Sequence, residues 1–246
     1  MSRRVISLSI DTAVILAAGL GRRLHPLTLV IPKSMLPIAD KPILEYIIEW
    51  LRKNGITDVI ICTGYLSNMI EGYFSDGSKI GVNVRYAKAD RLLGTAGQLK
   101  YAESLLNTDR FLCVYGDALY NFDLKGMFYR HENSNSIATI ALVPYRVRLP
   151  YGFICIDDEC MVTSWDEKPT IKGLINIGCY IMEKEFLSLI PDTPTHMNTV
   201  FIDAINKGRR ISAYVVDEDA FKDIGDKRSY MKVYREYIEM LGYDKI

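Results

Sequence analysis

The first stretch that could do chemistry is VILAAGLGRRLHPLTLVIPKSMLP, over residues 14–37. An apolar run is followed by two glycines and then by three basic residues: Gly19, Gly21, Arg22, Arg23 and Lys33. Glycines let the backbone approach a ligand and offer free N–H groups, and arginine and lysine add positive charge where phosphates would sit. These residue types and their spacing predict a loop that binds a phosphorylated ligand.

Two common phosphate-binding motifs do not match this loop. The dinucleotide fingerprint G-x-G-x-x-G requires a third glycine and a helix, whereas Arg-Arg-Leu follows Gly21, and Pro26, Pro32 and Pro37 forbid a regular helix. A Walker loop requires Gly-Lys-Ser/Thr, which the stretch lacks. Because irregular loops longer than about 12–15 residues are uncommon unless they are functional, a function for this one is favoured over an incidental surface loop.

Alternating strands and helices must position this loop. Short apolar runs predict strands over 12–17, 58–64, 82–87 and 110–117, and periodic segments predict helices over 41–55, 66–74 and 94–106, the last capped by Thr95. Such a series is typical of an α/β protein with a mostly parallel central sheet and helices on both faces, in which ligands bind beyond the carboxyl ends of the strands. The glycine turn and Asp117 both fall there.

The second half of the chain has a different pattern. Strands are expected over 136–145, 174–182 and 210–216, a hairpin over 151–169, and a closing helix over about 226–241. We therefore expect one continuous domain over 1–246, with a first lobe over about 12–135, a smaller mixed-sheet lobe over about 136–225 and a C-terminal helix over 226–246.

Composition excludes several classes of protein. The 30 basic and 30 acidic side chains cancel, so there is no electrostatic reason to expect a nucleic-acid or membrane partner. The five cysteines form no Cys-x-x-Cys pair, and Cys62 and Cys113 lie in apolar runs as expected of core thiols. No apolar run approaches the roughly 18 residues of a membrane span, and MSRRVISLSID is too short for a signal peptide. A reduced, cytoplasmic, soluble protein is expected.

The stretch LAAGLGRRLHPLTLVIPKSMLPIADKPILEY resembles the motif of the sugar-1-phosphate nucleotidyltransferases, the NDP-sugar pyrophosphorylases. Later landmarks of that family follow in order: Gly-Asp at 116–117, Tyr-Gly at 151–152, Glu-Lys-Pro at 167–169, Asn-x-Gly at 176–178 and Asp-Ile-Gly at 223–225. The resemblance covers roughly residues 12 to 240. It implies a Rossmann-like nucleotidyltransferase fold whose smaller lobe binds the sugar phosphate.

The resemblance also implies a reaction, in which an NTP and a sugar 1-phosphate give an NDP-sugar and pyrophosphate. Arg23 would contact the triphosphate, and Lys33 would bridge toward the α-phosphate; Arg22 occupies a position often held by a small hydroxyl residue. The nucleotide would lie against Leu16, Ala17, Ala18, Gly19, Gly21, Gly94 and Thr95. No protein nucleophile is required, so catalysis would consist of positioning and charge neutralisation.

The remaining roles also come from the resemblance. Asp117 and Asp223 would bind Mg²⁺, which prefers oxygen ligands and few protein donors. Lys168 would hold the sugar phosphate, Glu167 and Asn176 would hydrogen-bond the sugar hydroxyls, and Gly152 and Gly178 would leave room for the ring. For single motifs there are plainer interpretations, namely a strand-end turn at Asp117 and a helix cap at Asp223 or Asp226. His25, His131 and His196 show no ligand spacing.

The choice of substrate depends on a short cue. LLGTAG, within residues 89–100, is similar to the mannose-1-phosphate guanylyltransferase branch, which favours GTP with mannose 1-phosphate over dTTP or UTP with glucose 1-phosphate. A non-catalytic regulatory subunit that binds nucleotide sugars and a glycosyltransferase are the alternatives from other classes, the latter disfavoured because YGDALYNFD has no Asp-x-Asp spacing. The aromatic last helix could support a homo-oligomer or pack on its own sheet.

Overall fold

The structure, a computed structural model, describes residues 10–243, so most of the N-terminal stretch discussed above lies outside the described residues. Its centre is a seven-stranded sheet in the order β12-β8-β11-β6-β1-β4-β5. The strands are β1 (Thr12–Leu16), β4 (Asp58–Thr63), β5 (Asn83–Lys88), β6 (Arg110–Tyr115), β8 (Ala138–Arg148), β11 (Thr170–Glu183) and β12 (Ile211–Val215). β11 runs antiparallel to β6 and β8, and all other neighbours are parallel. The mostly parallel sheet is confirmed.

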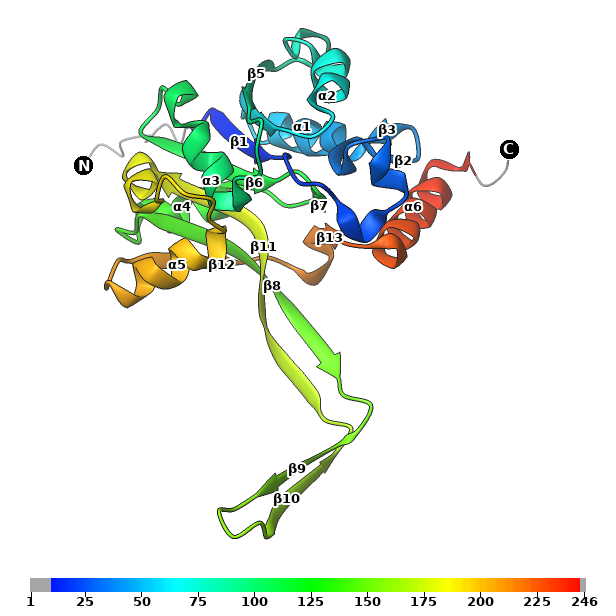
Figure 1. Ribbon diagram of the computed structural model, residues 1–246, viewed down its shortest axis with the longest axis vertical. Helices are drawn as coiled ribbons and strands as arrows, with labels where there is room; N and C mark the ends of the chain where they lie inside the picture. The colour runs from blue at the N-terminus through cyan, green and yellow to red at the C-terminus, as the bar shows by residue number, and fades with distance from the viewer. Residues whose placement is uncertain (1–9, 244–246) are drawn as a thin grey trace, which may run out of the picture.

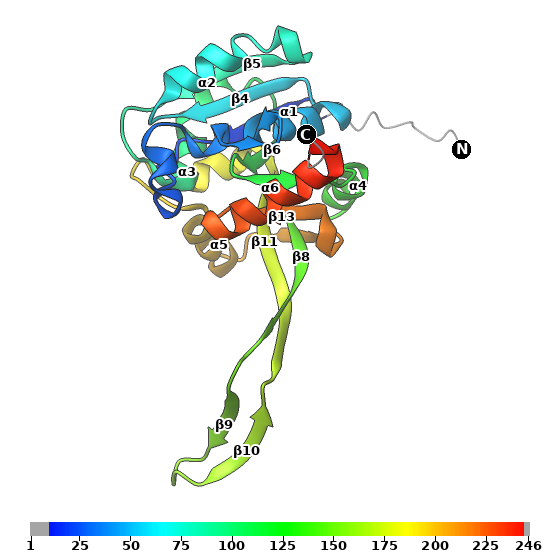
Figure 2. The same cartoon turned by 90° about the vertical axis from the view of Figure 1, so that its right-hand side faces the viewer.

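Helices cover both faces of this sheet, as Figures 1 and 2 show. Successive side chains of a strand point to opposite faces, so Ala13 and Ile15 of β1 join one buried cluster while Val14 and Leu16 join the other. The first cluster includes residues of α1 (Ile43–Lys53), α2 (Ser67–Phe74), α4 (Lys125–Glu132) and α6 (Lys227–Leu241), and the second includes residues of α3 (Gly94–Tyr101) and α5 (Met197–Asn206). None of the helices within residues 10–243 is long and apolar enough to cross a membrane.

The last helix, α6, packs on its own chain. It begins with a capping box in which Asp226 accepts from the Ser229 N–H, so the plainer interpretation of Asp226 as a helix cap is correct. The Tyr230 hydroxyl donates to the Pro37 carbonyl at 2.8 Å, and Tyr237 meets the ring of Tyr46 edge-on. These contacts show packing within the subunit, and a role of the aromatic residues in a homo-oligomer stays a prediction.

The helix expected over 94–106 begins at Gly94 as expected, but it ends earlier and has a different cap. α3 stops at Tyr101 and is followed by a 3-10 turn over Glu103–Leu105. Thr95 does not cap it: the residue before the helix is Leu93, no side-chain cap is made, and the Thr195 carbonyl accepts from the N–H groups of Ala96 and Gly97. The cap comes from a segment about a hundred residues away, which local sequence patterns do not reveal.

The second half of the chain extends the same sheet instead of forming a lobe with its own sheet. β8, β11 and β12 lie beside β6, and only the outer parts of β8 and β11 leave the body. Beyond them, β9 (Gly152–Ile156) and β10 (Val162–Glu167) form the expected hairpin. We call residues 144–174 the arm; Figures 1 and 2 show it projecting from the body, with the hairpin at its far end.

Candidate functional site

The glycine turn lies at the carboxyl end of β1. The N–H of Gly116, after β6, donates to the Leu16 carbonyl at 3.0 Å, and the buried Gln98 side chain accepts from the Ala18 N–H at 3.1 Å. Gly21 has a φ of +61°, and a Cβ there would lie 2.9 Å from Thr28 Cγ2, so packing and backbone both require glycine. Around Gly19 there is open space, which leaves its backbone accessible to a ligand.

The loop that follows is built of short turns rather than irregular chain. Three 3-10 turns occupy Arg22–Leu24, Leu27–Leu29 and Lys33–Met35, interrupted by the prolines that exclude a regular helix. Thr28 ties the loop back, because its hydroxyl donates to the Gly21 carbonyl at 2.8 Å. As a result, Lys33 packs against the glycine turn, with its Cβ 3.1 Å from the position that a Cβ of Gly21 would take.

Lys33 and Asp117 form the charged centre of the site. Lys33 Nζ lies 2.6 Å from Asp117 Oδ2, although the residues are 84 positions apart in the chain. The lysine side chain is 10% exposed and the aspartate 41%, so the carboxylate faces solvent from one side while its partner is nearly buried. A buried ammonium requires such a partner, because an unpaired charge removed from water is costly.

Asp223 reaches the same place through a small sheet. β7 (Ala118–Tyr120) directly follows Asp117 and pairs with β13 (Phe221–Asp223), which puts Asp223 opposite Ala118. The glycine at 225 leaves space for this carboxylate, since a Cβ there would lie 2.7 Å from Asp223 Oδ2. Of the predicted pair of carboxylates, Asp117 directly precedes one strand of this small sheet and Asp223 ends the other.

These two carboxylates fit a Mg²⁺ ion. Within residues 10–243, no group of three or more His, Cys, Asp or Glu residues is placed to hold a metal. Magnesium is usually bound through one or two carboxylates, and phosphates and water supply its other oxygen ligands. With Lys33, Asp117 and Asp223 together the centre carries a net charge of about −1, which attracts a divalent cation that arrives with a nucleotide.

A cavity of about 490 Å³ adjoins the glycine turn. It is lined by Ala18, Gly19, Leu20, Gly21, Arg22, Leu92, Leu93, Gly94, Thr95, Gln98, Pro194 and His196. The structure thus brings together the two segments expected to bind the nucleotide. Gln98 and His196 were missed in the sequence; Gln98 lies on α3 one turn after Gly94, whereas His196 offers no local signal.

Gly94 and Thr95 are held in place by the segment that precedes α5. Gly94 has a φ of +72°, and a Cβ there would collide with the Thr195 backbone. The Thr95 hydroxyl accepts from the Met197 N–H at 2.7 Å. This segment therefore fixes the wall of the cavity at the N-terminus of α3.

The two arginines take different positions. Arg22 lines the cavity. Arg23 lies near Asp226, at the start of α6. The pKa of Asp226 is lowered mainly by the hydrogen bond from the Ser229 N–H, and the positive charge of Arg23 adds to the lowering. The resemblance gave the triphosphate contact to Arg23, and that role stays a prediction. Arg22 is the arginine that the structure places at the cavity.

Asn176 and Gly178 lie on the body, at an irregularity in β11. The Asn176 amide accepts from the Gly178 N–H at 2.9 Å and donates to the Tyr180 hydroxyl at 2.7 Å. Gly178 has a φ of +70°, and a Cβ there would lie 2.5 Å from the ring of Tyr115, the last residue of β6. Burial raises the pKa of Tyr115, so its phenol is neutral near pH 7.

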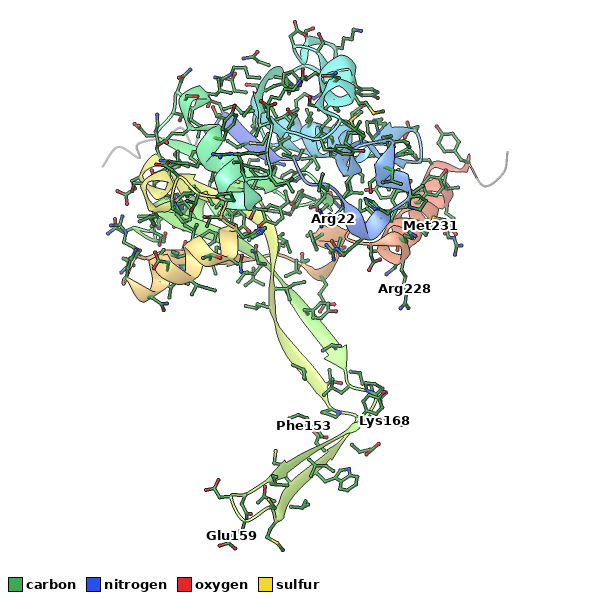
Figure 3. All side chains as sticks on the ribbon, viewed as in Figure 1. Arg22, Phe153, Glu159, Lys168, Arg228 and Met231 are labelled. Atoms are coloured by element: carbon green, nitrogen blue, oxygen red, sulfur yellow. The ribbon has the colours of Figure 1, made fainter. Side chains whose placement is uncertain are left out.

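The other three residues expected to bind the sugar phosphate lie on the arm. Glu167 accepts from Trp165 Nε1 at 3.1 Å, Gly152 is its cross-strand partner, and Lys168 follows with a φ of +53°. Figure 3 shows Lys168 at the junction of the arm and its hairpin, away from Arg22 on the body. Within one subunit, the structure does not bring Gly152, Glu167 and Lys168 to Lys33 and Asp117.

Cys62 and Cys113 are buried, which confirms the expectation that they are core thiols. His131 is buried and hydrogen-bonded in the interior. All five cysteines are free; Cys62, Cys113 and Cys179 are buried, and Cys155 and Cys160 are exposed on the arm hairpin.

A family model described as nucleotidyl transferase matches residues 12–240. The chain belongs to this family. Among similar proteins, a UTP–glucose-1-phosphate uridylyltransferase of Synechocystis is 33% identical, over 91% of this chain and 62% of that protein. A D-glycero-α-D-manno-heptose 1-phosphate guanylyltransferase of Campylobacter jejuni is 32% identical, over 89% of this chain and 96% of that protein. A mannose-1-phosphate guanylyltransferase of Mycobacterium tuberculosis is 36% identical, over 73% of this chain and 50% of that protein.

Solved structures show the same fold. HddC from Yersinia pseudotuberculosis superimposes with a TM-score of 0.72 at 28% identity, covering 93% of this chain and 100% of that chain. Our chain spans about three fifths of the length of the Synechocystis relative and half that of the mycobacterial one. The residues matched by the family model, 12–240, include the glycine turn, Lys33, Asp117 and Asp223.

Proposed function

We propose that this protein joins an NTP to a sugar 1-phosphate, giving an NDP-sugar and pyrophosphate. The observation that carries the proposal is the Lys33–Asp117 pair, with Asp223 on the neighbouring strand, beside a cavity lined by a glycine turn and the N-terminus of α3. Membership of the nucleotidyl transferase family supports it. No side chain is needed as a nucleophile, because the sugar phosphate supplies one.

The reaction forms one bond and breaks one. An oxygen of the sugar phosphate attacks the α-phosphorus of the NTP, the bond between the α-phosphorus and the bridging oxygen breaks, and pyrophosphate leaves with that electron pair. Asp117 and Asp223 would hold Mg²⁺, which when bound neutralises phosphate charge. Lys33, fixed by its buried position, adds a positive charge next to the glycine turn, and Arg22 adds another at the cavity wall.

For the substrates we propose GTP and mannose 1-phosphate. The LLGTAG segment lies at the cavity wall, and several relatives are named as guanylyltransferases of mannose or manno-heptose 1-phosphate. The alternative is UTP or dTTP with glucose 1-phosphate, and the name of the Synechocystis relative supports UTP. All of these pairs fit the same reaction, because they differ in the nucleoside and in the configuration of the hexose but not in the reacting phosphates.

The proposal is tested by measuring pyrophosphate release with Mg²⁺. Each of ATP, GTP, CTP, UTP and dTTP is combined with mannose 1-phosphate, glucose 1-phosphate and a manno-heptose 1-phosphate. Release with GTP and mannose 1-phosphate is expected, and release with UTP or dTTP and glucose 1-phosphate would identify the alternative pair. No release from folded protein that still binds a nucleotide would reject the transferase and support the regulatory subunit.

A matched pair of lysine variants controls this assay. Lys33→Ala removes the buried ammonium and should abolish turnover, whereas Lys207→Ala removes a lysine with a similar ion pair, 2.7 Å from Asp203, on the surface at the end of α5. Equal activity of the two variants would show that Lys33 has no part in the reaction.

A further inference from the structure

The arm carries an apolar surface with nothing from its own subunit to cover it. Every residue from Phe153 to Lys168 is exposed, including large side chains at Ile156, Met161, Val162 and Trp165, whose exposed fractions are 59–66%. Isolated two-stranded hairpins are marginally stable in water, and stable ones pack on other strands or helices. Figure 3 shows the hairpin remote from the body. We therefore expect the apolar side chains of the hairpin to pack against a partner surface.

Between Tyr145 and Arg148, the neck of the arm has one apolar and one charged side. Antiparallel register puts Val147 opposite Ile171 and Tyr145 opposite Gly173, so these apolar residues share one face. Arg148 and the pair Arg146–Lys172 occupy the other face, where their charges remain in water, together with the pair Pro144–Leu174 nearer the body. The arm is thus amphipathic, as expected of a ribbon that docks through one face.

On the hairpin, one face carries large apolar residues together with residues matched to the sugar-phosphate motif. Ile154 lies opposite Trp165, and Gly152 lies opposite Glu167. A Cβ on Gly152 would lie 2.9 Å from both Trp165 Nε1 and Glu167 Oε2, which puts all three residues on one side. A surface that covers Trp165 therefore also meets Glu167.

The ladder between β8 and β11 holds the hairpin away from the body of its own chain. Pairing is unbroken from Thr170–Arg148 to Asn176–Leu142, so the neck of the arm is a continuous ribbon. To bring Lys168 to Lys33 of the same chain, that ribbon would have to fold back and break its ladder. In a second copy of the chain, the hairpin is held away from that copy's own site in the same way. Each copy can therefore supply the hairpin that the other needs, and exchange of identical elements is a low-cost route to a symmetric dimer.

We propose that two copies of this chain exchange arms, so that the hairpin of each copy, with Glu167 and Lys168, completes the sugar-phosphate side of its partner's site. The proposal rests on the proposed function for the role of these two residues. The body of each copy supplies Lys33, Asp117, Asp223 and the nucleotide cavity, and its partner supplies the arm. The chemistry needs both copies, although each subunit folds its own core.

The first test measures molar mass by light scattering coupled to gel filtration. The full chain should be a dimer, and Trp165→Ser, or Ile154→Lys as a second variant, should convert it to a monomer with unchanged circular dichroism. Tyr129→Ser is the matched control, because Tyr129 lies on α4 of the body and is 66% exposed, as is Trp165. A monomeric wild type, or a dimer that survives both arm variants, would overturn the proposal.

The second test asks which subunit supplies Lys168. Lys33→Ala and Lys168→Ala are each expected to be inactive alone, and the two are co-expressed so that mixed dimers form. With exchanged arms, half of the dimers are mixed and each has one intact site of two, so about a quarter of wild-type turnover should return. No recovery would show that each arm serves its own subunit, and would overturn the exchange.

The two tests separate this inference from the proposed function. If the wild type releases no pyrophosphate with any substrate pair but dimerises through Trp165, the reaction is rejected and the docking of the arm on a second copy stands. If the wild type is active as a monomer, the reaction stands and the exchange is rejected.

Discussion

At the scale of single residues, the charged centre depends on one short contact between segments far apart in the chain. Lys33 is nearly buried, and its ammonium meets Asp117 at 2.6 Å, while Asp223 lies opposite the next residue along. Because the lysine neutralises only one of the two carboxylates, the centre retains a negative charge for a divalent cation. Changes of charge here should affect turnover more than folding.

Replacement of Asp117 by asparagine tests this balance. Asp117→Asn keeps the shape and an oxygen that can accept from Lys33, but removes the charge that attracts Mg²⁺. Turnover should fall by about a hundredfold or more, which corresponds to a loss of at least about 2.7 kcal/mol in charge stabilisation. The measurement is kcat at increasing Mg²⁺, together with a thermal melt to show that the fold survives. Full activity at ordinary Mg²⁺ concentrations would refute the metal role.

Gly94 offers a second residue-scale prediction, this time for stability. Gly94→Ala forces a φ of +72° on alanine and drives its Cβ into the Thr195 backbone, so the free energy of unfolding should fall by roughly 2–3 kcal/mol. Gly208 has the same φ of +72° with nothing near its missing Cβ, so Gly208→Ala should cost only the backbone strain, about 1 kcal/mol. Urea unfolding of both variants gives the comparison; equal losses would mean that the contact with Thr195 does not matter.

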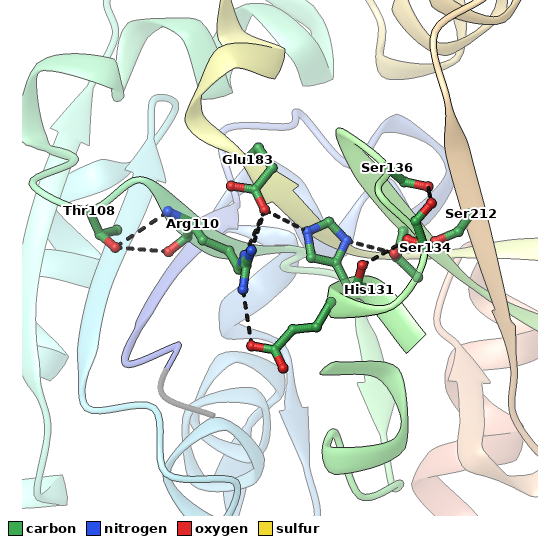
Figure 4. A network of polar contacts seen from close by, with 9 residues as sticks. Thr108, Arg110, His131, Ser134, Ser136, Glu183 and Ser212 are labelled. Atoms are coloured by element: carbon green, nitrogen blue, oxygen red, sulfur yellow. Dashed lines mark hydrogen bonds and ion pairs between the residues drawn. The ribbon is translucent and has the colours of Figure 1, made fainter. Parts of the chain in front are cut away.

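At the scale of elements, a buried polar network joins α4, β6, β8, β11 and β12 at the end of the sheet opposite the site (Figure 4). His131 Nε2 lies 3.0 Å from Glu183 Oε1, and His131 Nδ1 lies 2.7 Å from the Thr139 hydroxyl, which in turn meets Ser212. A neutral imidazole can make both hydrogen bonds, with Nε2 donating to Glu183 and Nδ1 accepting from Thr139. Arg110 also pairs with Glu183, at 2.7 Å.

This network predicts how stability depends on pH. Burial lowers the pKa of His131 from 6.5, although Glu183 opposes the shift. In the unfolded chain the histidine binds a proton at a higher pH than in the fold, so its contribution is complete above about pH 6.5 and is lost as the pH falls through the lowered pKa. Unfolding free energies measured between pH 5 and 7 should therefore decline on acidification.

A variant isolates the contribution of His131. His131→Gln removes the titration and keeps polar atoms that can meet Thr139 and Glu183, so its stability should be lower at neutral pH but flatter between pH 7 and 5. An equally steep decline in the variant would assign the pH dependence to other groups.

At the scale of the whole molecule, the cavity is enclosed by distant segments, so a bound nucleotide should stabilise the entire fold. At a GTP concentration a hundred times its Kd, with Mg²⁺, binding to the folded state adds about 2.7 kcal/mol, which raises the Tm by roughly 5–10 °C for a chain of this size. Thermal melts with each NTP, with and without EDTA, measure the shift. A Tm unchanged by every NTP would contradict the assignment of the cavity to the nucleotide.

The sequence alone was sufficient for the mostly parallel sheet of the first half and for most of the helices, whereas the roles of the site residues stay predictions. Val14 and Leu16 belong to a run that is apolar on both faces, and Ile43, Leu44, Ile47, Ile48 and Leu51 recur with the helical period, so local patterns determined these elements. The glycine turn was also evident, because φ values such as that of Gly21 restrict the residue type. These features depend on neighbours close in sequence.

Only the tertiary structure decided what depends on contacts between distant residues. It paired Lys33 with Asp117, capped α3 with Thr195 rather than Thr95, and put Arg22 rather than Arg23 at the cavity wall. It also put Lys168 on an arm away from the body, where the motif alone implied a single continuous site. A local pattern reports the period and conformation of a segment, whereas the direction in which a ribbon leaves its sheet is set by a register between strands far apart in the chain.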